Sequence, residues 1–163
     1  MQLKRSTRFR LLAGLVALIL PLAARAAPVM PGAALPSLSL EDQHGKTVST
    51  RAGTRIVLFA ADKAANDLIN EVLAAQPAGV LDTLNAVYFA DISGMPALVT
   101  RMFALPALRE MPFAVGLGRD ATQLADLPRQ KGAATIVRVA DGKVATIEYA
   151  RNAGQLMQAI GLK

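Results

Sequence analysis

The sequence predicts an α/β fold in which a mixed β-sheet carries helices on both faces, with an N-terminal β-hairpin extension. Continuous apolar runs at residues 56–61 and 86–90 have the pattern of strands that are buried on both faces. Each run is followed by apolar residues at helical spacing. Near the end of the chain, two alternating segments flank Asp141-Gly142, which is a strong hairpin signal.

The first 26 residues have the layout of a secretory signal peptide. Basic residues between positions 4 and 10 precede an apolar run from Leu11 to Leu20, and a small-residue site follows at Ala24-Arg25-Ala26. The run is short for a bilayer, which takes about 20 residues to span. We expect export to the periplasm and cleavage after Ala26, with retention as an anchor as the alternative. Residues 27–163 are then one domain.

Removing this segment changes the charge of the chain. The 163 residues include 18 basic and 12 acidic side chains, and five of the basic ones but none of the acidic ones lie in the first 26 positions. The net charge therefore falls from +6 to +1, and no basic stripe with interleaved aromatic residues remains. We expect no nucleic-acid partner, and no membrane insertion after cleavage.

The first half of the domain predicts a hairpin, a strand and a helix. Alternating apolar positions in LSLEDQHGKTVS, on either side of His44-Gly45, predict the hairpin. The apolar run at 56–61 predicts a buried strand, and Asp62 stands where it can cap the following helix. Apolar residues then recur at helical spacing as far as Leu73.

The second half continues the alternation. The strand NAVYFADIS ends near Asp91, and Ser93 and Pro96 begin a helix, PALVTRMFAL, that breaks near Pro106. PFAVGLGRD predicts a third central strand. After the terminal hairpin, Asn152 caps a last helix that ends before Gly161. Alternating strands and helices imply parallel neighbours, and the terminal hairpin adds antiparallel strands.

These motifs, in this order, resemble the thioredoxin-like superfamily, and in particular its exported TlpA-type and peroxiredoxin-type branch. LSLEDQHGKTVS is similar to the opening hairpin of that branch, and RIVLFAADKAAND is similar to the strand and helix start that carry its two redox cysteines. PFAVGLGRD and KGAATIVRVADGKV are similar to a later strand and to the final hairpin. The resemblance covers nearly all of residues 33–161.

The chain departs from this family at the redox site. It contains no cysteine, and the resemblance places Ala64 and Asp67 at the two cysteine positions. Ala134 takes the place of the family's cis-proline, and we expect the Ala133–Ala134 bond to be trans because a cis bond would cost about 2.5–4 kcal/mol there. Dithiol exchange needs a thiolate and a second sulfur. The composition therefore excludes thiol–disulfide oxidoreductase and peroxidase activity.

The junction still offers a helix N-terminus, whose N–H groups attract anions. Lys63 adds positive charge there, and the resemblance places the loop from Gly132 to Thr135 opposite. We therefore predict a binding face that comprises Asp62, Lys63, Ala64, Asp67, Ala133, Ala134 and Thr135. In the alternative, the face is vestigial: Asp62 is a helix cap, and Lys63 and Asp67 are solvated.

Other polar residues have structural interpretations. His44 lies in a turn without a catalytic partner, and Ser93 lacks a base, so we expect it to cap a helix. Asp91 is expected to bond the turn at Ser93, while a cation site shared with Asp62 or Asp67 is the alternative. We expect no catalytic residue, no metal and no cofactor.

The sequence thus predicts an exported thioredoxin-fold protein without dithiol redox activity, which acts as a binding or scaffold module for an envelope protein or peptide. One alternative is a non-thiol enzyme or accessory protein that uses a bound metal or cofactor near Asp62, Asp67 or Asp91. Another is a helper that docks a second thioredoxin-like protein.

Overall fold

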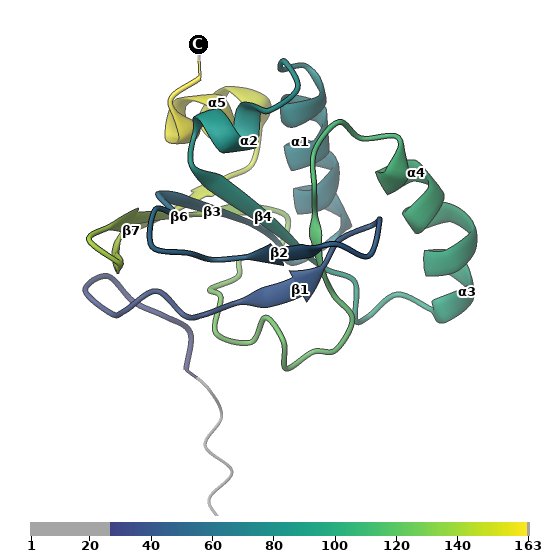
Figure 1. Cartoon of the computed structure of the whole chain (residues 1–163), viewed down its shortest axis with the longest axis horizontal. Coiled ribbons are helices and arrows are strands. Elements are labelled where there is room, and N and C mark those ends of the chain that lie inside the picture. The colour runs from purple at the N-terminus through teal and green to yellow at the C-terminus, as the bar shows by residue number, and fades with distance from the viewer. Residues whose placement is uncertain (1–26, 163) are drawn as a thin grey trace, which may run out of the picture.

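A computed structural model describes residues 27–162, so the predicted signal peptide lies outside the described residues. The core is a five-stranded sheet of order β5-β4-β3-β6-β7 (Figure 1). Strands β3 (Ile56–Ala60), β4 (Ala86–Asp91) and β5 (Gly116–Gly118) are parallel. Strands β6 (Ala134–Ala140) and β7 (Lys143–Ala150) continue the sheet in antiparallel pairs. The predicted mixed sheet is confirmed.

One face of the sheet packs against the helices α1 (Lys63–Ala74), α2 (Val80–Thr83) and α5 (Ala153–Ile160). In Figure 1 these helices lie together above the sheet. Their buried side chains join one cluster with the side chains that alternate along β3, β4 and β6, such as Leu58 and Ile136. Within residues 27–162, no helix is both long enough and apolar enough to cross a membrane.

The other face of the sheet is covered without helices, which differs from the expected distribution. Its cluster of alternate strand residues packs against Leu38 and Leu40 from the N-terminal hairpin, and against Leu124 and Leu127 from the segment 119–131. That segment forms turns, because its side chains accept hydrogen bonds from nearby backbone N–H groups that a helix would use.

The N-terminal hairpin pairs β1 (Ser39–Glu41) with β2 (Thr47–Ser49), as predicted. The Asp42 carboxylate holds its turn, since Oδ1 accepts hydrogen bonds from the N–H groups of His44 at 2.7 Å and Lys46 at 2.8 Å.

A buried glutamine attaches this hairpin to the main domain. Gln43 is 2% exposed, and its Nε2 donates to the carbonyls of Leu108 at 3.2 Å and Phe113 at 2.7 Å. Its Oε1 accepts from the N–H of Val115 at 3.0 Å. The amide thereby fixes the hairpin against the segment that leads into β5.

A continuous helical segment runs through α3 (Ala97–Val99), the π-helical turn η1 (Thr100–Ala104) and α4 (Leu105–Arg109). The predicted break near Pro106 was therefore wrong. A proline has no N–H to donate to the carbonyl four residues earlier. Just before Pro106 the helix changes to π-helical hydrogen bonding, because the N–H of Leu105 donates to the carbonyl of Thr100, five residues earlier. We call residues 97–109 the bent helix.

Strand β5 lies at the edge of the sheet, so the prediction of a third central strand was wrong. It has three residues, and its glycines permit close packing: a methyl group on Gly116 would lie 2.5 Å from the Phe89 ring.

Local signals near the C-terminus are confirmed. Asp141 and Gly142 both have positive φ, at 50° and 72°, as a tight hairpin turn requires. The side chain of Asn152 accepts from the N–H of Gln155 at 2.9 Å and caps α5, which ends at Gly161 in the left-handed conformation.

Candidate functional site

The start of α1 and the loop before β6 face each other, and a single carboxylate joins them. Asp62 Oδ1 caps the helix by accepting from the N–H of Ala65 at 3.0 Å. Its Oδ2 accepts from the N–H of Gly132 at 2.7 Å. The cap predicted from sequence is confirmed, and the same side chain also closes the helix terminus against the loop.

These contacts determine the charge state of Asp62. Partial burial acts to raise the pKa of the carboxyl, but the N–H groups of Gly132, Ala65 and Ala64 and the charge of Lys131 outweigh burial and hold its pKa below the usual value. Asp62 is therefore a fixed anion at neutral pH. The helix N-terminus, which the sequence offered to an external anion, already holds this internal one.

The two positions matched to the redox cysteines lie on the first turns of α1, exposed to solvent. Ala64 has no polar group, and Asp67 accepts from Lys63 Nζ at 2.5 Å. The two charged side chains remain 57% and 84% exposed. Neither position supplies a thiol.

The structure removes three residues from the predicted face. Ala133, Ala134 and Thr135 are fully buried, so their side chains offer no surface to a partner. The Ala133–Ala134 peptide is trans, as expected. Thr135 Oγ1 donates to the carbonyl of Pro128 at 2.9 Å, which turns its hydroxyl inward. These three residues are buried because they lead into and begin β6, which lies between β3 and β7 in the sheet.

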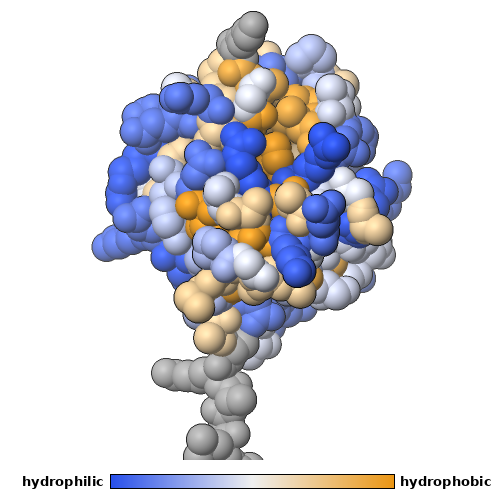
Figure 2. All heavy atoms as spheres, turned by 90° about the vertical axis from the view of Figure 1, so that its left-hand side faces the viewer, coloured by the Kyte–Doolittle hydropathy of each residue, from blue (hydrophilic) through white to orange (hydrophobic). Residues whose placement is uncertain are grey.

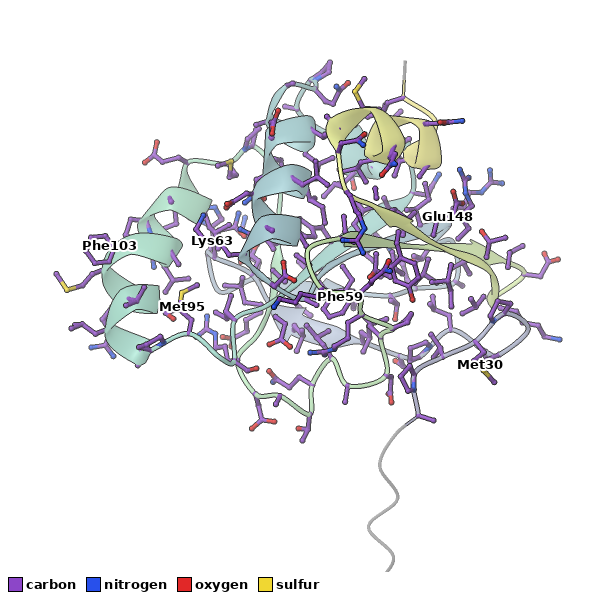
Figure 3. All side chains as sticks on the ribbon, turned by 180° about the vertical axis from the view of Figure 1, so that it is seen from behind. Met30, Phe59, Lys63, Met95, Phe103 and Glu148 are labelled. Carbon is purple, nitrogen blue, oxygen red and sulfur yellow. The ribbon has the colours of Figure 1, made fainter. Side chains whose placement is uncertain are left out.

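Of the other predicted residues, Asp62, Lys63 and Asp67 line a groove of about 590 Å³ between α1 and the bent helix, and Ala64 does not. Figure 3 shows Lys63 at the start of α1 and Met95 shortly before the bent helix. The α1 wall is polar and the opposite wall is apolar. The α1 wall is lined by Asp62, Lys63, Asn66, Asp67, Asn70, Glu71 and Ala74, and the opposite wall by Met95, Val99, Phe103, Ala104, Ala107, Leu108 and Met111.

The buried hydroxyl group of Tyr88 contacts a residue of the polar wall. Tyr88 on β4 is fully buried, and its hydroxyl donates to Asn66 Oδ1 at 2.7 Å. Burial, together with the negative charge of Asp67, raises the pKa of Tyr88 far above its usual value. The hydroxyl therefore stays protonated and fixes the Asn66 side chain in the groove wall.

Asp91 lies at the floor of the groove and is bound internally. Its Oδ1 accepts from the N–H of Ser93 at 3.0 Å and from its hydroxyl at 2.6 Å, as the turn interpretation predicted. Ser93 does not cap a helix, because its hydroxyl serves Asp91 and α3 begins later, at Ala97.

Arg129 is the partner of Asp91 that the sequence analysis missed. Its Nη1 lies 2.9 Å from Asp91 Oδ2, its Nη2 donates to the carbonyl of Leu124, and its Cζ lies 5.3 Å from the centre of the Phe59 ring. No local pattern links positions so far apart in the chain.

The acidic residues do not form a metal centre. Among residues 27–162, no three histidine, aspartate or glutamate side chains come together as a cation site requires. His44 is exposed in its turn, away from the groove.

The fold and this site define a thioredoxin-like α/β protein whose redox positions carry no sulfur. Comparisons of the sequence with family models and with curated proteins found no match. Solved structures show the fold. A peroxiredoxin-like protein from Aquifex aeolicus matches with a TM-score of 0.53 and 10% identity, over 84% of this chain and 89% of that one.

Two further structures agree. A putative protein disulfide isomerase from Bacteroides thetaiotaomicron gives a TM-score of 0.54 at 13% identity, over 82% of this chain and 87% of that one. A putative thiol:disulfide interchange protein DsbE from Chlorobium tepidum gives 0.53 at 17% identity, over 82% and 99%. At these identities the likeness establishes the fold, and the activities in those names belong to those proteins.

Proposed function

We propose that this chain is an exported, thioredoxin-fold binding module of the periplasm, which holds an envelope protein or peptide in the groove beside α1. The layout of the first 26 residues supports export. The observation that supports binding is the groove beside α1. It starts at Asp62 and Lys63, next to the positions of the lost cysteines, and continues along the helix to Ala74.

The chemistry of the site favours binding over catalysis. The carboxylate of Asp62 is held by backbone N–H groups, that of Asp67 by Lys63, and that of Asp91 by Arg129 and Ser93. A general base needs a free group within reach of its substrate. Recognition by shape and charge requires no such group.

A non-thiol enzyme with a metal or cofactor near Asp62, Asp67 or Asp91 is the second candidate. Each of these carboxylates contacts a different internal partner, and no contact between them draws them together. Thermal melting with Ca²⁺, Mg²⁺, Cu⁺, flavin and nucleotides tests it, because a ligand at 100 times its dissociation constant stabilises a protein by about 2.7 kcal/mol.

Capture from an envelope extract tests the groove. Ala107 lies exposed in the apolar wall, so Ala107→Glu places a charge inside the groove while keeping a good helix former. Ala97→Glu is the matched control, since Ala97 is exposed on the same bent helix but outside the groove. The proposal expects partners that Ala97→Glu retains and Ala107→Glu loses. Identical capture by both variants would refute a function of this groove.

A further inference from the structure

The surface of the bent helix is unusually apolar. Four of the six exposed large hydrophobic residues in the described part of the chain lie on it, including Leu98 at 68%, Met102 at 58% and Phe103 at 67% exposure. The β7 side of the molecule also shows hydrophobic areas, with hydrophilic side chains around them (Figure 2). Clustered exposed apolar side chains mark interaction surfaces.

The facing wall is negatively charged. Among the described residues that line the groove, four are carboxylates, namely Asp62, Asp67, Glu71 and Asp91, and one is an ammonium, Lys63. Lys63 pairs with Asp67, and Arg129, from outside the groove, pairs with Asp91, so two negative charges remain in excess. A ligand for this wall must bring positive charge.

The shape of the groove fits a helix. Its α1 wall is lined at positions 63, 66, 67, 70, 71 and 74, which form one side of a helix of 12 residues. At 1.5 Å per residue this wall is about 18 Å long. The bent helix lines the other wall at similar spacing. A third helix of about three turns can lie between two such walls, with apolar anchors on one side.

We infer that the groove binds an amphipathic helix whose apolar face packs on Val99, Phe103 and Ala107 and whose flank carries lysine or arginine toward Asp67 and Glu71. The inference rests on the proposed function and specifies the chemistry of the partner. The negative wall disfavours an anionic lipid surface, which attracts basic segments.

Synthetic peptides of about 12 residues test the inference. Three share a composition of apolar residues and one tryptophan: one carries lysines on the flank, one carries glutamates at the same positions, and one is the lysine peptide scrambled to lose its amphipathic face. Tryptophan emission reports binding without background, because the chain contains no tryptophan. We expect the lysine peptide to bind at least about tenfold more tightly than both others, and less tightly as salt rises. If either of the other two peptides binds as tightly as the lysine peptide, the inference is overturned.

Paired variants locate the binding site. Glu71→Lys reverses an exposed charge in the groove and should weaken the lysine peptide about fivefold, while Glu41→Lys makes the same change outside the groove, on β1, and should leave it unchanged. Ala107→Glu should weaken it further than Ala97→Glu. If Ala107→Glu fails to fold by circular dichroism, the exposed Glu71→Lys decides the result.

Two outcomes separate this inference from the proposed function. If Ala107→Glu abolishes capture from the extract but the peptides bind alike, the basic helix is refuted and the groove remains a binding site. If sedimentation shows dimers that Ala107→Glu dissociates, a second copy of the chain fills the groove, and the inference is again overturned.

Discussion

Replacing Asp62 by alanine removes both halves of the connection between α1 and the loop before β6. Losing a helix cap costs about 0.5–2 kcal/mol, and leaving the Gly132 N–H without an acceptor costs about 1–3 kcal/mol. Both groups are partly exposed, so the lower part of each range applies. We expect Asp62→Ala to reduce the free energy of unfolding by about 2 kcal/mol.

The loss should depend on pH in a defined direction. The pKa of Asp62 is lower in the folded protein than its ordinary value of 3.8. Its stabilising contribution is therefore complete above the unfolded pKa, and it disappears as the pH falls through the folded pKa. The difference in stability between the native chain and Asp62→Ala should be largest above about pH 4 and should shrink at lower pH.

Thermal and denaturant unfolding at several pH values measure this difference. An unfolding entropy of about 2.1 cal/mol/K per residue converts 1 kcal/mol into about 3.5 °C, so Asp62→Ala should lower Tm by about 7 °C at pH 7. Asp62→Ser should recover about half of the loss, because a serine hydroxyl can cap the helix but is too short to reach Gly132. An equal loss at pH 7 and pH 2.5, or a full recovery with serine, would refute the reasoning.

Three other substitutions test contacts that hold the site. Arg129→Met should lower Tm by about 4–10 °C, because it leaves the buried Asp91 carboxylate without its cation, and the double variant with Asp91→Asn should recover part of this loss. Gln43→Leu should reduce the free energy of unfolding by about 2–4 kcal/mol in denaturant titrations, because it leaves three backbone groups without the hydrogen bonds that the Gln43 side chain makes to them. Gly116→Ala should cost about 1–3 kcal/mol in the same titration, because the new methyl group meets the Phe89 ring.

Local chemistry explains the features that were predictable. Asp62 and Asn152 each precede apolar residues at helical spacing, and each caps a helix. Asp141-Gly142 adopts the positive φ angles that its residue types favour. The apolar runs at 56–60 and 86–90 form strands and are buried by neighbours on both faces. In all these cases, residues a few positions apart determine the outcome.

Contacts between distant residues explain what could not be predicted. Gln43 bonds groups 65 to 72 positions away, and Asp62 reaches an N–H group 70 positions away. Residues 119–131 contain apolar side chains that cover a sheet face without forming a helix. The bent helix passes Pro106 because the turn before it widens, a change that propensity does not encode.

The absence of cysteine changes what the helix terminus can do in this chain. A helix N-terminus stabilises negative charge, which is how it can activate a cysteine thiolate. Here the Asp62 carboxylate occupies the terminus of α1 and bonds Gly132, so the positive end of the helix stabilises the fold. The proposed ligand would therefore meet the side of α1 and not its end. That side is acidic and faces apolar residues across the groove, and Asp67, one of the two positions matched to the redox cysteines, lines it.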